Sequence, residues 1–233
     1  MQESYWAIRE GSKSFAAASR LFGRDTRERS WLLYHWCRRC DDLADGQDFG
    51  GELAEVHDSR EAEDKVQAIR ALTRRALDGQ PTLDLAFDSF GMVAAEVGLT
   101  QDMADDVIAG FALDAQGWQP RTEAEMMRYC YHVAGAVGVM MARVMQAPDD
   151  SWVYDRACDL GLAFQLANIA RDIVEDDAAE RCYIPQEWLA DADIKQGEHA
   201  KPHNRFKLAG VVPRLVAMME SDLLQVLIKS LRY

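Results

Sequence analysis

The 233-residue sequence is short of basic side chains, with 26 Lys and Arg residues against 39 Asp and Glu and a formal net charge of −13. Binding to a nucleic-acid backbone needs a basic surface, so this balance argues against a nucleic-acid partner. An acidic balance suits an enzyme that uses a cation, although many soluble proteins without such a role are equally acidic. Charge therefore excludes one class of function and leaves others open.

Long apolar runs are also missing. The longest, over residues 133–142, is far short of the roughly 20 residues that a membrane-spanning helix needs, so we expect no integral membrane protein. The chain has five cysteines, an odd number, and no secretory signal at its start, which predicts reduced thiols in the cytoplasm. Cys37 and Cys40 form a C-x-x-C pair, but no second pair follows at a zinc-site spacing, so we expect neither zinc nor redox chemistry there.

Proline is rare, with six residues, and alternating β-branched stretches are few. The apolar residues instead recur with a helical period, which predicts an all-α protein with one domain over residues 1–233. The segment 178–206 is predicted to be a loop with a short helix, and the glycine-rich stretch 46–51 is predicted to end the helix before it. Helices are expected over 3–22, 26–45, 62–78, 84–96, 101–116, 123–144 and 151–177, and again from near Leu208.

Two of these predicted helices carry paired carboxylates four residues apart, Asp41 with Asp45 and Asp172 with Asp176. On a helix such residues share one face, roughly 5–6 Å apart, so each pair can offer two oxygen ligands. Oxygen ligands are those that Mg²⁺ prefers, and substrate phosphates commonly complete its coordination. Two facing pairs would therefore hold Mg²⁺ and a diphosphate. For either pair alone, a solvated acidic face is an equally good explanation.

The surroundings of both pairs favour a site. Taking 100° per residue, each pair lies on a polar stripe within an otherwise apolar helix, where an unpaired carboxylate costs several kcal/mol. The stripe of the first pair includes Tyr34, Cys37 and Arg38, and that of the second includes Gly161, Gln165 and Asn168. Asp42 lies about 100° away from the stripe of Asp41 and ranks below its neighbours.

Small residues are concentrated over 133–138, within the predicted helix 123–144. Glycine inside a helix costs about 1 kcal/mol relative to alanine, so another interaction must offset it. One explanation is close helix packing, and the other is room for an apolar ligand chain and a local bend that lines its tunnel. We interpret His132 as a packing histidine, because no other histidine lies at a metal-site spacing.

Several stretches closely resemble the squalene/phytoene synthase family, and their sequences are most similar to those of bacterial phytoene synthases. The resemblance runs in order from about residue 5 to about residue 215. It is carried by the segments 12–15 (SKSF), 34–38 (YHWCR), 40–45 (CDDLAD), 129–135 (YCYHVAG), 164–172 (FQLANIARD) and 181–185 (RCYIP). The resemblance implies an isoprenoid-synthase helical bundle around a central cavity. Family members usually continue through several more helices, so we expect this chain to lack C-terminal helices of the domain.

The activity implied by the resemblance is that of a 15-cis-phytoene synthase of carotenoid biosynthesis, a prenyltransferase that joins two geranylgeranyl diphosphates head to head. Mg²⁺ (or Mn²⁺) is implied and NADPH is not expected. The implied metal ligands are Asp41, Asp45, Asn168, Asp172 and Asp176, of which the four aspartates, with Tyr129, form the catalytic set. The implied substrate-binding residues are Ser12, Lys13, Ser14, Tyr34, Arg38, Gln165 and Arg171.

Two alternatives remain at this point. A squalene or dehydrosqualene synthase would use farnesyl diphosphate instead, and a non-catalytic relative would act as an assembly or lipid-binding factor. The sequence has no G-x-G-x-x-G fingerprint, which mildly disfavours an NADPH step, and both acidic pairs are intact, which disfavours the non-catalytic reading. We expect a cytoplasmic protein with peripheral contact at the inner membrane face.

Overall fold

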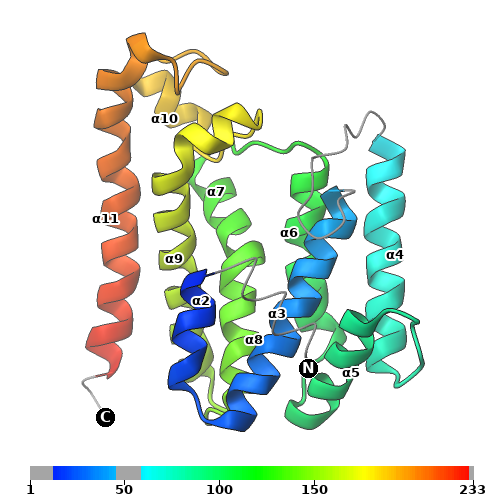
Figure 1. Cartoon of the computed structure of the whole chain (residues 1–233). Coiled ribbons are helices and arrows are strands. Elements are labelled where there is room, and N and C mark those ends of the chain that lie inside the picture. The colour runs from blue at the N-terminus through cyan, green and yellow to red at the C-terminus, as the bar shows by residue number, and fades with distance from the viewer. Residues whose placement is uncertain (1–12, 46–58, 231–233) are drawn as a thin grey trace. The chain divides into compact units, whose positions relative to one another are not determined.

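The computed structural model describes residues 13–45 and 59–230; the predicted stop at 46–51 and the predicted helical residues 3–12 lie outside this part of the chain. The described residues form helices and no strand, which confirms the predicted all-α class (Figure 1). The chain packs as two compact units, one of residues 1–116 with 140–149 and one of residues 117–139 with 150–233. The single domain expected over 1–233 stays a prediction.

The first unit contains a bundle in which α3 (Arg24–Asp45) packs on α4 (Ser59–Leu77), α5 (Leu85–Val97) and α6 (Gln101–Ala115). A short helix, α2 (Lys13–Ala18), and a 3₁₀ turn, Ser19–Leu21, precede α3. In the core, the Trp36 ring stacks on Phe90 with centroids 4.2 Å apart, and its indole N–H donates to Thr73 Oγ1 at 3.3 Å.

The ends of α3 and α5 are tied by a charged pair. Asp84 caps α5 by accepting a hydrogen bond from the backbone N–H of Ala86 at 3.0 Å. The other carboxylate oxygen of Asp84 accepts from Arg39 on α3 at 2.8 Å. One side chain therefore both starts a helix and fixes it to the helix that carries the first acidic motif.

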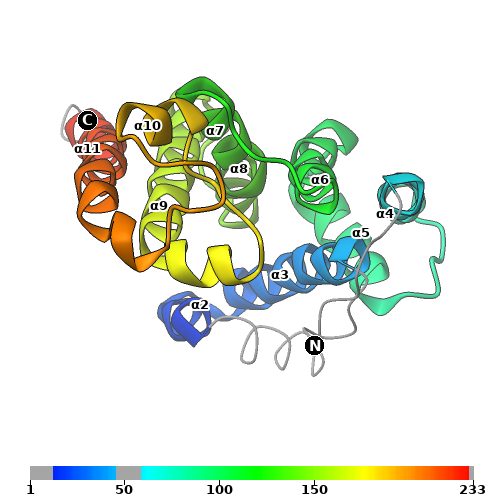
Figure 2. The same ribbon diagram turned by 90° about the horizontal axis from the view of Figure 1, so that it is seen from above.

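The second unit is built on α9 (Ser151–Ala178), with α11 (Arg205–Ser230) packed along it. Both views show these two helices side by side (Figures 1 and 2). The helix expected over 123–144 forms as α7 (Glu123–Cys130), a π-helical turn (Tyr131–Gly135) and α8 (Ala136–Val144). A π turn carries one extra residue, so the helix is locally irregular at the small residues singled out above.

Those small residues allow close backbone contact with α9. A Cβ atom added at Gly138 would lie 2.2 Å from the carbonyl oxygen of Ala157, and one added at Gly161 would lie 2.3 Å from that of Ala134. No side chain fits at such distances. Close helix packing, the first of the two explanations, is therefore present.

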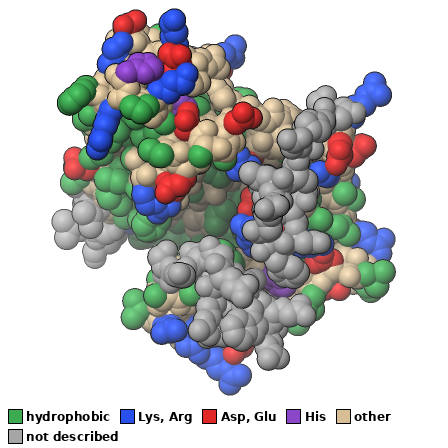
Figure 3. Space-filling view, turned by 45° about the horizontal axis from the view of Figure 1, so that its top comes forward, with side chains coloured by type: hydrophobic (Ala, Val, Ile, Leu, Met, Phe, Trp, Pro, Cys, Tyr) green, Lys and Arg blue, Asp and Glu red, His purple; other side chains and the backbone are tan. Residues whose placement is uncertain are grey.

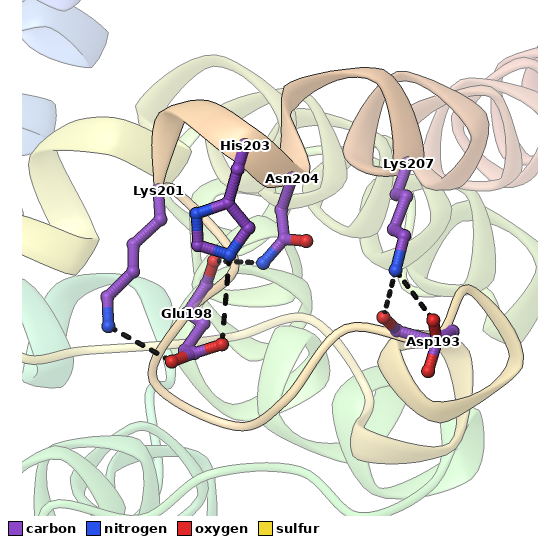
Figure 4. Close-up of polar contacts among 6 residues, drawn as sticks. All are labelled: Asp193, Glu198, Lys201, His203, Asn204 and Lys207. Atoms are coloured by element: carbon purple, nitrogen blue, oxygen red, sulfur yellow. Dashed lines mark hydrogen bonds and ion pairs between the residues drawn. The ribbon is translucent and has the colours of Figure 1, made fainter.

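The connection from α10 (Gln186–Asp191) to α11 is held by polar contacts (Figure 4). Glu198 pairs with Lys201 at 3.2 Å, and its carbonyl oxygen accepts from Asn204 at 2.9 Å. Lys207 donates to both the backbone and the side chain of Asp193, at 2.6 and 2.7 Å. Acidic, basic and histidine side chains are mixed over the surface of this connection (Figure 3). Among the described helices, none is both long and apolar enough to cross a bilayer.

Candidate active site

The first acidic motif lies in the last turns of α3, where Arg38 contacts two carboxylates of its own helix. Its Nη1 donates to Asp41 Oδ2 at 3.0 Å, and its Nη2 lies 2.7 Å from Asp42 Oδ1 in an ion pair. Asp42 is only 2% exposed, whereas Asp41 is partly open to solvent. Arg38 therefore pairs both with the buried carboxylate of Asp42 and with the partly exposed carboxylate of Asp41, and the lower rank given to Asp42 stays a prediction.

Tyr34 lies one turn before Arg38 and is half-buried. Its ring centroid is 5.8 Å from that of Phe15, with the planes tilted by 32°. Burial raises the pKa of the Tyr34 hydroxyl, and the nearby Arg38 partly opposes this. Ser12 lies outside the described residues, as do the side chains of Lys13, Ser14 and Asp45, so their predicted roles stay predictions.

The cysteines of the C-x-x-C pair lie on α3, which runs through them without interruption. Burial raises the pKa of the Cys37 thiol to about 12 and that of Cys40 well above its ordinary value. The thiolate is the form that binds metal or attacks a disulfide, and burial disfavours that form in both side chains.

The second acidic motif lies on α9. The predicted stripe is present, and Asn168 Nδ2 donates weakly to Gln165 Oε1 at 3.4 Å. Arg171 donates to both oxygens of the adjacent Asp172, each at 2.6 Å, in a forked pair. Burial, and then the negative charge of Asp172, raises the pKa of Asp176 to about 6. Two carboxylates are therefore crowded in a partly desolvated place, where a cation is favoured.

Tyr129 is buried in the last turn of α7, just before the π turn. Its ring stacks on that of Tyr183, with centroids 4.8 Å apart and planes 15° apart, and on that of Trp118, with centroids 5.6 Å apart and planes 24° apart. Aromatic pairs of this kind are worth about 0.5–1.5 kcal/mol beyond their buried area. His132, one turn later, packs edge-on against Tyr131, which fits its interpretation as a packing residue.

Other residues near the end of α9 were missed from the sequence. His199 is buried, and its Nε2 lies 3.4 Å from Oδ1 of Asp177, which follows Asp176 directly. Burial lowers the pKa of His199, and the charge of Asp177 partly opposes this. Nothing in the local sequence of His199 or of Trp118 indicates these contacts, whereas Tyr183 lies in a segment that carries the family resemblance.

Among the described side chains, each acidic motif offers carboxylates to a metal ion but not a complete set of ligands. Within the part of the chain that the structure describes, no group of three or more His, Cys, Asp or Glu side chains is placed to bind one. Each helix instead offers carboxylate oxygens and an arginine, Arg38 on α3 and Arg171 on α9. This combination suits a ligand that brings both negative oxygens and a cation, such as a metal-bound diphosphate.

Comparison with known proteins agrees with this chemistry. Residues 8–228 match the squalene/phytoene synthase family. The chain belongs to that family. It is 49% identical to a phytoene synthase from Pseudescherichia vulneris and 44% identical to a 15-cis-phytoene synthase from Pantoea ananas, in each case over 90% of this chain and 67% of the relative.

Solved structures support the same fold. A dehydrosqualene synthase crystallised with a ligand has a TM-score of 0.81 at 23% identity, covering 97% of this chain and 75% of that one. A squalene synthase from Alicyclobacillus acidocaldarius has a TM-score of 0.77, also at 23% identity, covering 96% and 82%. At this identity the likeness establishes the isoprenoid-synthase helical fold alone.

Proposed function

We propose that the protein is a 15-cis-phytoene synthase, a prenyltransferase that joins two molecules of geranylgeranyl diphosphate head to head. The observation that carries this proposal is the 44–49% identity to phytoene synthases over 90% of the chain. Both acidic helices also retain the carboxylates that such chemistry requires.

The reaction has two stages. In the first, diphosphate leaves one substrate, the double bond of the second substrate attacks the resulting allylic cation, and loss of a proton gives a cyclopropylcarbinyl diphosphate. In the second, the remaining diphosphate leaves, the carbon skeleton rearranges, and loss of another proton gives phytoene. The balance needs no hydride, and hence no NADPH. A squalene synthase differs in that NADPH delivers a hydride to the final cation.

The oxygen-only donor set fits Mg²⁺ or Mn²⁺. Asp172 and the half-buried Asp176 are crowded enough to raise the pKa of Asp176, as expected for carboxylates that a cation would relieve. Bound there, a divalent cation would neutralise diphosphate oxygens and make diphosphate a better leaving group. The proposed metal ligands are Asp41, Asp45, Asn168, Asp172 and Asp176.

Arginines supply the remaining charge for the diphosphate. Arg171 is largely exposed, and the parallel N–H groups of its guanidinium can bind two oxygens of a phosphate as well as the two of Asp172. Arg38 is held between Asp41 and Asp42, so its guanidinium is fixed in direction before a ligand arrives. Ser12, Lys13 and Ser14 are proposed to close over phosphate oxygens.

Tyr34, Tyr129 and Gln165 are proposed to surround the carbocation. A tyrosine ring face stabilises a nearby positive charge, and this is the part that Tyr34 is proposed to offer. The ring of Tyr129 stacks on two other rings, so its hydroxyl edge is the part proposed to lie towards the carbocation. The direction of this ring is set by packing.

Product release favours contact with a membrane. Phytoene is a forty-carbon hydrocarbon without a polar group, and each CH₂ moved into water costs about 0.8 kcal/mol. We therefore propose peripheral association with the inner membrane face, with the product passing directly into lipid. Liposomes should then speed steady-state turnover, and turnover that is unaffected by liposomes would contradict this route.

Substrate and product identify the function directly. Purified protein is incubated with Mg²⁺ and either geranylgeranyl or farnesyl diphosphate, with and without NADPH, and the hydrocarbon is identified by mass spectrometry. We expect phytoene from geranylgeranyl diphosphate, with no effect of NADPH. A strong preference for farnesyl diphosphate would favour a squalene or dehydrosqualene synthase, and no hydrocarbon from either would favour a non-catalytic assembly or lipid-binding factor.

A further inference from the structure

Three aromatic rings from three separate segments meet at Tyr129. Tyr129 belongs to α7, Trp118 precedes that helix, and Tyr183 follows the acidic end of α9. Both neighbouring rings stack on Tyr129 with planes within 24° of its own. Tyr129 and Tyr183 are buried, and Trp118 is half-buried. The stack therefore connects the segment after the second acidic motif with the side chain proposed to face the carbocation.

The segment that carries Trp118 is anchored to the segment that carries Tyr183. The backbone N–H of Gln186 donates to the Pro120 carbonyl at 3.0 Å, and that of Glu187 donates to the Arg121 carbonyl at 3.1 Å. The Glu187 carboxylate also accepts from the backbone N–H of Glu123 at 2.7 Å. Two connections that are more than sixty residues apart are thus joined a few residues after each of the two rings.

Gly117 forms a turn directly before Trp118. Its φ of +62° is a left-handed conformation that suits glycine, and it lies between the end of α6 and Trp118. At the other end of the segment, the Thr122 hydroxyl caps α7 by accepting from the backbone N–H of Glu125 at 3.2 Å. Trp118 is therefore fixed between a turn and a helix cap.

We propose that Trp118 is a positioning residue for Tyr129. The role rests on the proposed function, since it assumes that Tyr129 faces the reacting carbons. The π turn begins two residues after Tyr129, so the helix that carries it is irregular on one side. Contacts from outside that helix are needed to fix the ring, and Trp118 and Tyr183 provide them. A small misplacement of a group at a reacting centre can lower the rate about a hundredfold.

The test compares Trp118→Met with Trp118→Phe in the purified protein. Methionine fills space without a flat ring, whereas phenylalanine keeps a ring that can stack. We expect Trp118→Met to lower kcat for phytoene formation about tenfold or more, with KM for geranylgeranyl diphosphate changed less than about threefold. Trp118→Phe should restore kcat to within about threefold of wild type.

A matched control is Trp152→Leu. Trp152 is also half-buried in the same unit, stacks under Arg156, and lies 20 residues before Asp172 on α9. Its loss should lower the melting temperature about as much as Trp118→Met does, with kcat near wild type. If both variants lose kcat in proportion to folded protein, Trp118 has a structural role only and the proposal is overturned.

A spectroscopic readout does not require turnover. The seven tyrosines are labelled with 3-fluorotyrosine, and the Tyr129 resonance is assigned from the Tyr129→Phe variant. We expect this ¹⁹F resonance to shift in Trp118→Met, through the lost ring current, and to shift much less in Trp118→Phe and Trp152→Leu. An unchanged resonance in Trp118→Met overturns the proposal.

Two further outcomes are decisive. Should Trp118→Met not fold, Tyr183→Leu removes the other ring of the stack and should lower kcat with little change in KM; full activity in that variant overturns the proposal. A wild-type protein that makes no phytoene overturns the proposed function. A wild-type protein that makes phytoene, with Trp118→Met equally active, overturns the positioning role alone.

Discussion

The guanidinium of Arg171 holds both carboxylate oxygens of its chain neighbour Asp172, each at 2.6 Å. This hydrogen-bonded pair raises the pKa of Arg171 above its ordinary value. Arg171 is mostly exposed, and exposed ion pairs contribute at most about 1 kcal/mol to stability. The pair therefore orients a proposed metal ligand and a proposed diphosphate ligand while contributing little to the fold.

Arg171→Lys separates the effect of this ion pair on substrate binding from its effect on stability. Lysine keeps the charge but cannot form the fork, so we expect kcat/KM for geranylgeranyl diphosphate to fall about tenfold or more while the free energy of unfolding changes by less than about 1 kcal/mol. Steady-state kinetics and chemical denaturation measure the two quantities. Arg24→Lys is the control. Arg24 is exposed like Arg171 and pairs with Glu28 at 2.8 Å, but it lies at the start of α3, at the opposite end of that helix from the acidic motif. Equal activity of both variants would leave Arg171 without a role in substrate binding.

Diphosphate should stabilise the protein only together with a divalent cation. Carboxylates and diphosphate repel one another at close range unless a cation lies between them. We expect the melting temperature to rise when diphosphate and Mg²⁺ are both present and to stay unchanged with diphosphate in EDTA. Sulfate at the same ionic strength is the control. Equal stabilisation in EDTA would mean that the arginines bind diphosphate alone.

Asp176 should make the metal-free protein less stable as pH rises. Its pKa of about 6 in the folded state is above the ordinary aspartate value, so the folded state binds its proton more tightly than the unfolded state does. The stability that the protonated Asp176 side chain gives to the folded state is fully present below a pH of about 4 and is lost as the pH rises through about 6. Because the side chain is partly exposed, we expect a loss on the order of 1 kcal/mol. Denaturation of wild type and Asp176→Asn in EDTA, at pH 4.5 and 7.5, measures the difference.

In that comparison Asp176→Asn should be more stable than wild type at pH 7.5, and the advantage should shrink at pH 4.5. Titrating groups far from Asp176 affect both proteins alike, so the difference between the two proteins reports Asp176 together with its interaction with neighbouring charges such as Asp172. An advantage that is the same at both pH values would show that desolvation and Asp172 do not act on Asp176 as described.

Gly138 should not tolerate alanine. The added Cβ would meet the Ala157 carbonyl oxygen at 2.2 Å, so α8 and α9 would have to move apart, at a cost of at least about 2 kcal/mol. The matched control is Gly210→Ala in α11, where nothing lies within 4 Å and alanine should stabilise the helix by about 0.5–1 kcal/mol. Thermal denaturation measures both. If both glycines accept alanine equally, the backbones of α8 and α9 are not in contact.

Local patterns were enough to predict several of the helices, whereas the described part of the helix expected over 3–22 forms only α2 and a 3₁₀ turn. The helix expected over 151–177 is α9 (Ser151–Ala178), and that expected over 101–116 is α6 (Gln101–Ala115), because periodicity, caps and breakers lie within the segment itself. An angle of 100° per residue also placed Asp42 on a different side of its helix from Asp41, and Asp42 is the buried residue of the two.

Contacts between distant segments could not be predicted in this way. The stack of Trp118 on Tyr129 depends on a loop that is fixed by hydrogen bonds to residues near 186, and no local pattern encodes that pairing. The forked pair of Arg171 with Asp172 was also missed, since adjacent helical residues do not normally face each other and only the long arginine side chain bridges them. The π turn at Tyr131–Gly135 differs from the regular helix that periodicity predicts.

The assignment of the acidic helices to catalysis is tested most directly by measuring phytoene formation from geranylgeranyl diphosphate, with Mg²⁺ and without NADPH, in wild type, Asp41→Asn and Asp172→Asn. We expect phytoene from wild type, none in EDTA, and a loss of about a thousandfold or more in each variant, with melting temperatures equal to or above that of wild type because removing a carboxylate relieves repulsion. Near-normal phytoene formation by either variant would contradict the assignment of these carboxylates to the reaction.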